Sequence, residues 1–133
     1  GFDFLESIQG MQDVRESETG AFGTLMIYQS IAKRNLSEVG LSWANAMIFL
    51  QGGDVEAQVQ LDSRDGRFRV TVSDFRGPLN NPTYTPSLFE VYILKKNGTI
   101  RSKQFDQTKL LYDHLFGMLF NPEQPVIESD DDW

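Results

Sequence analysis

The sequence predicts an α+β fold: an antiparallel β-sheet of four to six strands with two helices packed on one face. The first sign is strict alternation of apolar and polar residues over 55–76, which is typical of strands with one buried face. The second is helical spacing of apolar residues over 36–51 and 107–120. Because 133 residues suit one core, we expect a single domain over 1–122 and a flexible acidic tail over 123–133.

The negative charge of the chain lies at its two ends. The net charge is −7, but residues 1–20 contain five acids and one base, and residues 121–133 contain five acids and no base. Residues 21–120 are therefore at +2. The absence of cysteine excludes disulfides and thiolate metal sites. No run of 18 apolar residues occurs, so we expect no transmembrane segment, and no signal peptide is recognisable in the chain.

The first 29 residues predict a strand after an ambiguous segment. Residues 3–16 fit a short helix, with Asp3 and Glu6 as a capping pair, or a strand that enters a turn at 18–20. Residues 21–29 are apolar on both faces, which is typical of a strand in the centre of a sheet.

A helix is expected next, over 36–51. Asn35 or Ser37 can serve as its cap, and Gly52-Gly53 would end it. Trp43 and Met47 lie on its apolar face, where they are candidates for a ligand pocket. The favoured interpretation is plain core, because apolar helix faces usually pack on sheets.

Residues 55–76 predict a β-hairpin. Asp65-Gly66 supplies the two positive-φ residues of a type I′ turn, so a two-residue loop joins the strands. This loop sets the register, because a slip by one residue would turn the apolar side chains into water. The expected opposite pairs are Leu61 with Val70, Val59 with Val72, Asp62 with Arg69, and Gln60 with Thr71. Phe75 is out of phase with Val70 and Val72, which predicts a bulge or the end of the strand.

A loop and a second hairpin are expected after the first. The loop, 77–86, contains three prolines and offers Tyr84 as a candidate contact residue. A strand is predicted over 88–95, and Asn97-Gly98 predicts a type I′ turn into a polar edge strand over 99–104. The apolar face of the strand would consist of Phe89, Val91 and Ile93.

Two groups of basic residues are candidate binding patches. Arg64, Arg67 and Arg69 near the first turn could contact an anion or nucleic acid, but Asp62 and Asp65 lie among them. A solvated, self-paired face is therefore favoured. A phosphate or an acidic partner could bind the second group, although a soluble sheet edge is the favoured interpretation. The second group consists of Lys95, Lys96, Arg101 and Lys103.

The last helix is expected to begin at Asp106 or Thr108 and to end at Asn121-Pro122. His114, the only histidine, lies on it next to Asp113, and a surface or half-buried position is favoured over a role as catalytic base. The predicted core stripe consists of Leu111, Leu115, Met118 and Leu119. One histidine excludes metal sites that need two, and neither a Gly-x-Ser-x-Gly elbow nor a phosphate loop occurs. We predict no catalytic, cofactor-binding or metal-binding residue and no cofactor.

The stretch 65–75, Asp-Gly-Arg-Phe-Arg-Val-Thr-Val-Ser-Asp-Phe, resembles the signature hairpin of a domain of unknown function. That domain occurs in exported proteins of Bacteroidetes and has a TATA-binding-protein-like fold. Its hairpin typically reads Lys-Asp-Gly-Arg-Tyr-Arg, where this chain has Arg64 and Phe68. The acidic segment 13–20 with the strand after it, and the helix over 107–120, also resemble the family. The family usually has a helix before its first hairpin, for which this chain leaves little room.

The resemblance implies an antiparallel sheet of that fold and export to the periplasm or cell surface. It implies no known activity and no DNA binding, because a shared fold is not a shared site. Our first functional hypothesis is a non-enzymatic binding or interaction module, monomeric or homodimeric, whose partner is a protein or a small ligand.

Two other functions remain as alternatives. The first is a small-ligand pocket between helix and sheet, as in cone-shaped α+β folds, with hydrolase or isomerase chemistry. A large apolar cavity that contains a buried carboxylate would favour it. The second is nucleic-acid binding through the polar sheet face, which is disfavoured because that face lacks aromatic platforms. The polar face contains Gln58, Gln60, Thr71 and Ser73.

Overall fold

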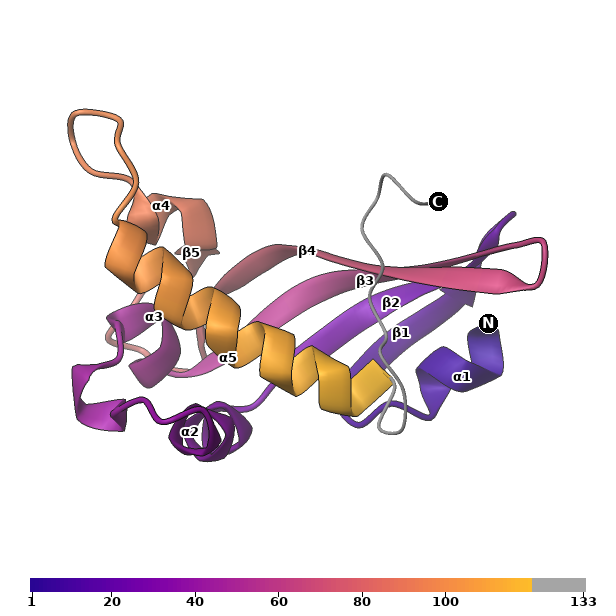
Figure 1. Ribbon diagram of the computed structural model, residues 1–133, viewed down its shortest axis with the longest axis horizontal. Helices are drawn as coiled ribbons and strands as arrows, with labels where there is room; N and C mark the ends of the chain where they lie inside the picture. The colour runs from indigo at the N-terminus through magenta and orange to yellow at the C-terminus, as the bar shows by residue number, and fades with distance from the viewer. Residues whose placement is uncertain (121–133) are drawn as a thin grey trace.

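The computed structural model describes residues 1–120 and shows an α+β fold around a five-stranded antiparallel sheet (Figure 1). The strands lie in the sheet in chain order, β1-β2-β3-β4-β5. Their bounds are Met11–Glu16 for β1, Gly20–Ile27 for β2, Asp54–Arg64 for β3, Arg67–Leu79 for β4 and Ser87–Leu88 for β5. The expected fold class is confirmed, while the expected tail at 123–133 lies outside the described residues.

The β3–β4 hairpin has the predicted register. Leu61 lies opposite Val70, Val59 opposite Val72, Asp62 opposite Arg69, and Gln60 opposite Thr71. Asp65 and Gly66 have φ angles of 51° and 77°, as a two-residue type I′ loop requires. Turn chemistry and period-two alternation agree here, so local sequence determines the pairing.

The predicted irregularity at Phe75 is a β-bulge. Gln58 lies opposite Ser73 and Glu56 opposite Arg76, so one residue of β3 faces two residues of β4. The extra residue, Asp74, has a φ of 55°. The bulge turns Phe75 to the same side as Val70 and Val72, where its ring meets the last helix.

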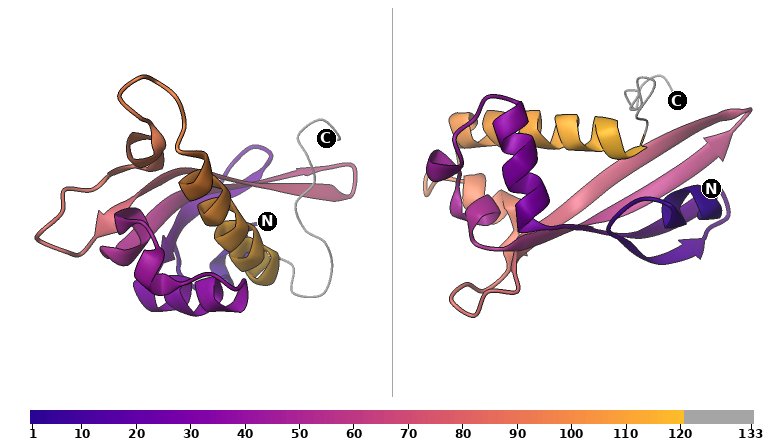
Figure 2. Two further views of the ribbon diagram at one scale, coloured as in Figure 1. Left: turned by 60° about the vertical axis from the view of Figure 1, so that its left-hand side comes forward. Right: turned by 90° about the horizontal axis from the view of Figure 1, so that it is seen from below.

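Helices cover one face of the sheet, and the core lies between them and the strands (Figure 2). The helices are α1 (Phe2–Glu6), α2 (Gln29–Glu38), α3 (Ile48–Gln51), α4 (Phe89–Ile93) and α5 (Ser102–Phe120), with a 3-10 turn at Trp43–Asn45. Every second residue of β2 and β3 is buried on this face, and the residues between them, on the other face, are exposed or half-exposed. The interior strand predicted at 21–29 is thus confirmed as β2, with only one of its faces covered.

The single helix predicted over 36–51 is wrong. This part of the chain forms α2, the 3-10 turn and α3, and α2 already begins at Gln29. Gly40, with a φ of 80°, ends α2 in a Schellman motif, in which the N–H of Leu41 donates to the carbonyl of Leu36. At the other end, the Asp54 carboxylate accepts a hydrogen bond from the N–H of Gln29 (2.8 Å), so β3 caps α2 from outside its own sequence.

The strands predicted over 88–95 and 99–104 are also wrong. Only Ser87–Leu88 pairs with β4, and the chain then forms α4, which buries Phe89 and Ile93 and exposes Val91. Phe89 and Ile93 fit one face of a helix as well as one face of a strand, so alternation alone misleads. The turn at Asn97-Gly98 supports one isolated bridge, Leu94 to Ile100, and Asn97 does not have the positive φ of a type I′ turn.

The last helix begins earlier than expected. It starts at Ser102, and its buried face includes three aromatic residues outside the predicted core stripe, Tyr112, Phe116 and Phe120. Met118, expected in the core, is 48% exposed. The ambiguous segment at 3–16 contains both alternatives, the short helix α1 and the strand β1. No helix within residues 1–120 is long and apolar enough to cross a membrane.

Candidate functional site

The sheet has an open edge along β4. The strand β5 pairs only with Arg76 and Gly77, so no described strand lies beside the part of β4 that runs to the turn (Figure 1). In a hairpin closed by two residues, hydrogen-bonded and non-hydrogen-bonded pairs alternate from the turn. This places the backbone N–H and C=O groups of Phe68, Val70 and Val72 on the side away from β3. We call these groups the open edge.

The alternation is visible on the opposite strand. Ser63, the partner of Phe68, donates its N–H to the carbonyl of Thr19 (2.7 Å) and not to β4. The backbone groups of Phe68 must then point outward as well. Within residues 1–120 these three donors and three acceptors have no partner strand, although Val70 is only 3% exposed, so the edge is covered at its centre.

A pocket of about 450 Å³ lies next to the open edge, between β4, α4 and α5. We call it the edge pocket. Its lining consists of Val70, Thr71, Val72, Phe75, Phe89, Glu90, Phe105, Thr108, Lys109, Tyr112, Asp113 and Phe116. Its volume falls in the range of small-ligand sites, and most of its lining is aromatic or aliphatic.

Three stacked rings form one wall of the edge pocket. Phe75 stacks on Tyr112 with ring centroids 4.9 Å apart, and Tyr112 stacks on Phe116 at 5.5 Å. The bulge in β4 supplies Phe75, and the i, i+4 spacing on α5 supplies the other two rings. Aromatic faces of this kind bind flat or aliphatic groups by contact area and dispersion.

Tyr112 carries a buried hydroxyl. Its Oη has no hydrogen-bond partner within the described part of the chain, and the residue is 6% exposed. Burial raises the pKa of the phenol well above its ordinary value, so the group stays neutral at physiological pH. A buried hydroxyl without a hydrogen-bond partner destabilises the fold.

Charged groups occur only at the rim of the edge pocket. Lys109 Nζ donates to Asp113 Oδ2 at 2.5 Å, one turn apart on α5, and this hydrogen bond raises the pKa of Lys109. Glu90, on α4, is exposed. Among residues 1–120, the buried polar side chains are those of Asn35 and Thr108, so the pocket holds no buried carboxylate.

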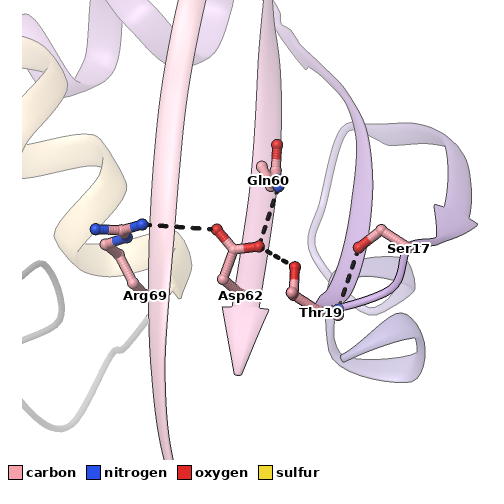
Figure 3. Close-up of polar contacts among 6 residues, drawn as sticks. Ser17, Thr19, Gln60, Asp62 and Arg69 are labelled. Atoms are coloured by element: carbon pink, nitrogen blue, oxygen red, sulfur yellow. Dashed lines mark hydrogen bonds and ion pairs between the residues drawn. The ribbon is translucent and has the colours of Figure 1, made fainter. Parts of the chain in front are cut away.

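The arginines near the first turn lie away from this pocket, on or beside the uncovered face of the sheet. Figure 3 shows the polar contacts there, which centre on Asp62. Its carboxylate accepts hydrogen bonds from Thr19 Oγ1 (2.5 Å) and Gln60 Nε2 (3.0 Å), and Arg69 lies 3.9 Å away. The network joins β4, β3 and the β1–β2 turn, so Asp62 acts as a cross-link. This agrees with the self-paired face that the sequence favours.

The other candidate residues lie apart from one another. His114 Nε2 is 2.9 Å from Glu38 Oε2, in a contact that joins α5 to α2. Met47 lines a smaller pocket of about 230 Å³, whereas Trp43 packs against the core. Tyr84 is half-buried in the loop before β5. The second basic group lies exposed around the connection from α4 to α5, except that Lys103 reaches the smaller pocket.

No group of three or more His, Cys, Asp or Glu side chains within residues 1–120 is arranged to hold a metal ion. Comparisons of the chain with protein families, with curated proteins and with solved structures found no match. The resemblance to the Bacteroidetes domain and to the TATA-binding-protein-like fold therefore stays a prediction.

The sequence does not indicate the edge pocket as such, although it predicts several of its walls. The valines of β4 and the displaced Phe75 were expected correctly, but a strand over 88–95 would have covered the open edge. The aromatic pair Tyr112 and Phe116 on one helix face was the available signal. Such a pair is as typical of a hydrophobic core as of a binding site. The two cases differ here only because β5 is short and leaves the pocket beside β4 uncovered.

Proposed function

We propose that the chain is a binding module whose binding site is the edge pocket. The observation that supports this is an apolar pocket of about 450 Å³ that has aromatic walls and opens beside a strand edge with no neighbouring strand among residues 1–120. Ligand sites are typically concave and mostly apolar, with a few polar groups. The ligand is expected to be apolar where it contacts Phe75 and Tyr112, and polar where it meets the rim.

The pocket suits binding better than catalysis. Hydrolase or isomerase chemistry in such a site commonly uses an acid or base whose pKa is shifted by burial. The two carboxyl groups of the lining are Glu90, which is exposed, and Asp113, which is held by Lys109. The lining residue with a strongly raised pKa is Tyr112, whose hydroxyl is closed off from solvent.

The uncovered sheet face offers less support for nucleic-acid binding. Its charges are paired across strands, as between Arg76 and Glu56 at 3.4 Å and between Arg69 and Asp62. Phe22 is an aromatic ring on this face, whereas single-strand binders stack successive bases on several. We further propose an exported location, which rests on the sequence resemblance alone.

The proposal is tested with the fluorescent probe 8-anilinonaphthalene-1-sulfonate and the full chain. Val72→Phe fills part of the pocket from its sheet wall and is expected to weaken probe binding at least about tenfold. Leu110→Phe, on the exposed side of α5 and outside the pocket lining, is the matched control and should change nothing. Equal effects of the two variants, with both still folded by circular dichroism, would contradict the proposal.

A further inference from the structure

We infer that the segment 88–103, which contains α4 and the turn into α5, binds the surface of an anionic lipid membrane. We call this segment the tip, and its turn projects away from the sheet (Figures 1 and 2). The tip combines a stripe of exposed aliphatic side chains with a group of cations. Proteins that lie on anionic membranes use these two features together.

The stripe begins along α4. Leu88, Val91 and Leu94 follow one another at intervals of three residues, which places them on the same side of the helix. The helical turn extends to the last of them, because the N–H of Leu94 donates to the carbonyl of Glu90 (3.2 Å). The opposite side of α4 is the buried one. The stripe therefore faces solvent while the other side of α4 packs on the core.

The turn into α5 adds Ile100 to the stripe. Leu94 and Ile100 form an antiparallel bridge, and the hydrogen bond beside it runs from the Lys95 N–H to the Thr99 carbonyl (2.8 Å). The bridged residues are thus a non-hydrogen-bonded pair, in which opposite side chains lie closest together. The side chains of the stripe are 43% to 65% exposed, and none of them lines the edge pocket. The inference is therefore independent of the edge pocket.

Four exposed cations accompany the stripe. Within residues 1–120 none of them has an ion-pair partner, and the one acid of the tip is Glu90, so the tip has a net charge of +3. The sequence had suggested that these cations protect a sheet edge, but the structure forms no edge strand there. The four are Lys95, Lys96, Arg101 and Lys103.

The distribution of charge orients the tip toward an anionic surface. Residues 1–20 contain five acids and one base, a net charge of −4, and they lie at the opposite end of the molecule (Figure 1). An anionic surface attracts the positive end and repels the negative end, so the approach is directional even though the whole chain is acidic.

The shape and chemistry of the tip favour lipid over other anionic partners. Single-stranded nucleic acids stack their bases on aromatic rings, whereas the stripe is aliphatic. A stable protein interface uses about 20–30 residues on each side. A projecting turn needs only a few side chains to enter the boundary between headgroups and acyl chains, about 5–10 Å deep. Lysine and arginine beside it would then contact the lipid phosphates.

The test is co-sedimentation of the full chain with vesicles that contain equal amounts of phosphatidylcholine and phosphatidylglycerol. We expect the chain to bind these vesicles at low salt and to bind pure phosphatidylcholine vesicles at least about tenfold more weakly. Raising the salt to about 1 M should release most of the bound protein, because screening removes the attraction of the cations.

Two apolar variants with matched exposure test the stripe. Leu94→Ser combined with Ile100→Ser should weaken binding to the mixed vesicles at least about tenfold. The control combines Leu110→Ser with Met118→Ser, which changes two side chains of nearly equal exposure, 49% and 48%, on α5. The control should bind as the parent chain does, and circular dichroism checks that both variants fold.

Two charge variants test the cations in the same way. Lys95→Gln combined with Lys96→Gln should weaken binding at low salt at least about tenfold. Lys33→Gln combined with Arg34→Gln removes the same charge from adjacent exposed residues of α2 and should have an effect of less than about threefold. These substitutions lie at exposed positions, so they keep the test valid if the serine variant of the tip does not fold.

The pattern of losses decides the outcome. Selective loss of vesicle binding in both tip variants supports the inference. No binding of the parent chain to the mixed vesicles, or equal losses in tip and control variants, overturns it. Binding to a single-stranded oligonucleotide but not to vesicles would mean that the cations serve nucleic acid and would also overturn it. If Val72→Phe abolishes vesicle binding and the tip variants do not, a lipid chain enters the edge pocket and the inference is wrong.

Discussion

The two sides of the helix-covered sheet face differ in how they are closed. At the centre, β2 and β3 bury Leu25, Ala57 and Val59 completely beneath the helices. Towards β4 the cover is incomplete, since Val72 and Phe75 remain half-exposed and line a pocket. Both sides have the same alternation of apolar residues and belong to the same hydrogen-bonded sheet. The difference therefore comes from how completely the helices cover each side. We call them the closed side and the open side.

Part of this difference comes from the short strand β5. A longer β5 would pair with β4 and remove its edge, but the chain turns into α4 after Leu88. The bulge at Asp74 adds to the effect because it directs Phe75 toward α5. Stability is thus expected to concentrate on the closed side and binding on the open side.

The largest effect is expected for Leu25→Ala on the closed side. Leu25 is fully buried, so the substitution leaves a cavity and should lower the free energy of unfolding by about 3 kcal/mol. Leu110→Ala, at a residue 49% exposed, should lower it by less than about 0.5 kcal/mol. Chemical denaturation measures both values. Similar losses at the two positions would remove the distinction between core and surface on which the comparison depends.

The sharpest comparison uses two valines that lie opposite each other on the same face. Val59→Ala removes two methyl groups from a residue that is 1% exposed and should cost about 2 kcal/mol. Val72→Ala removes the same groups beside a pocket and should cost about 0.5 kcal/mol, because little packing is lost. Equal costs, measured by urea denaturation, would mean that the open side is packed as densely as the closed side.

A gain in stability of about 1 kcal/mol is expected for Tyr112→Phe. The substitution removes a buried hydroxyl that has no partner in the described residues and keeps the stacked ring. The raised pKa adds a pH dependence: the unfolded phenol ionises near pH 10 while the folded one does not, so stability falls as pH rises above about 10.

The phenylalanine variant should lose less stability between about pH 9 and pH 11 than the parent chain does. Thermal unfolding at several pH values measures both effects. A loss of about 1 kcal/mol at neutral pH would show instead that the hydroxyl has a stabilising partner.

The smallest effect is expected for Glu38→Gln. Glu38 contacts His114 at 2.9 Å, but both side chains are partly exposed, so the contact should contribute at most about 0.5 kcal/mol. The variant should also leave binding of the fluorescent probe unchanged, because neither residue lines the edge pocket. A stability loss above about 1 kcal/mol would show that the contact between α2 and α5 matters more than its exposure suggests.

The sequence predicts the strands of the sheet better than the helices that cover them, for a physical reason. The β3–β4 register follows from Asp65-Gly66 and period-two alternation, both of which are local. The end of α2 at Gly40 also has a local sequence signal. Gly52-Gly53 is an equally good stop signal, however, and the apolar residues between the two positions fit a helix. The cap of α2 by Asp54 comes from another strand and has no signal near Gln29.

The edge pocket depends on contacts that no local pattern encodes. The spacing of Phe89, Val91 and Ile93 fits a strand as well as a helix, and tertiary packing favours the helix. Whether β4 has a neighbour depends on that choice. Some walls of the site, on β4 and α5, could therefore be predicted from the sequence, while the α4 wall and the opening beside them could not.

The most direct test of the account is a methyl NMR titration of the full chain with the fluorescent probe. Val59 and Val72 serve as paired reporters because they lie opposite each other on one sheet face. The account predicts saturable shifts at the methyl groups of Val70 and Val72 and little change at Val59. Shifts confined to residues outside the edge pocket, or no saturable shift at Val72, would contradict it.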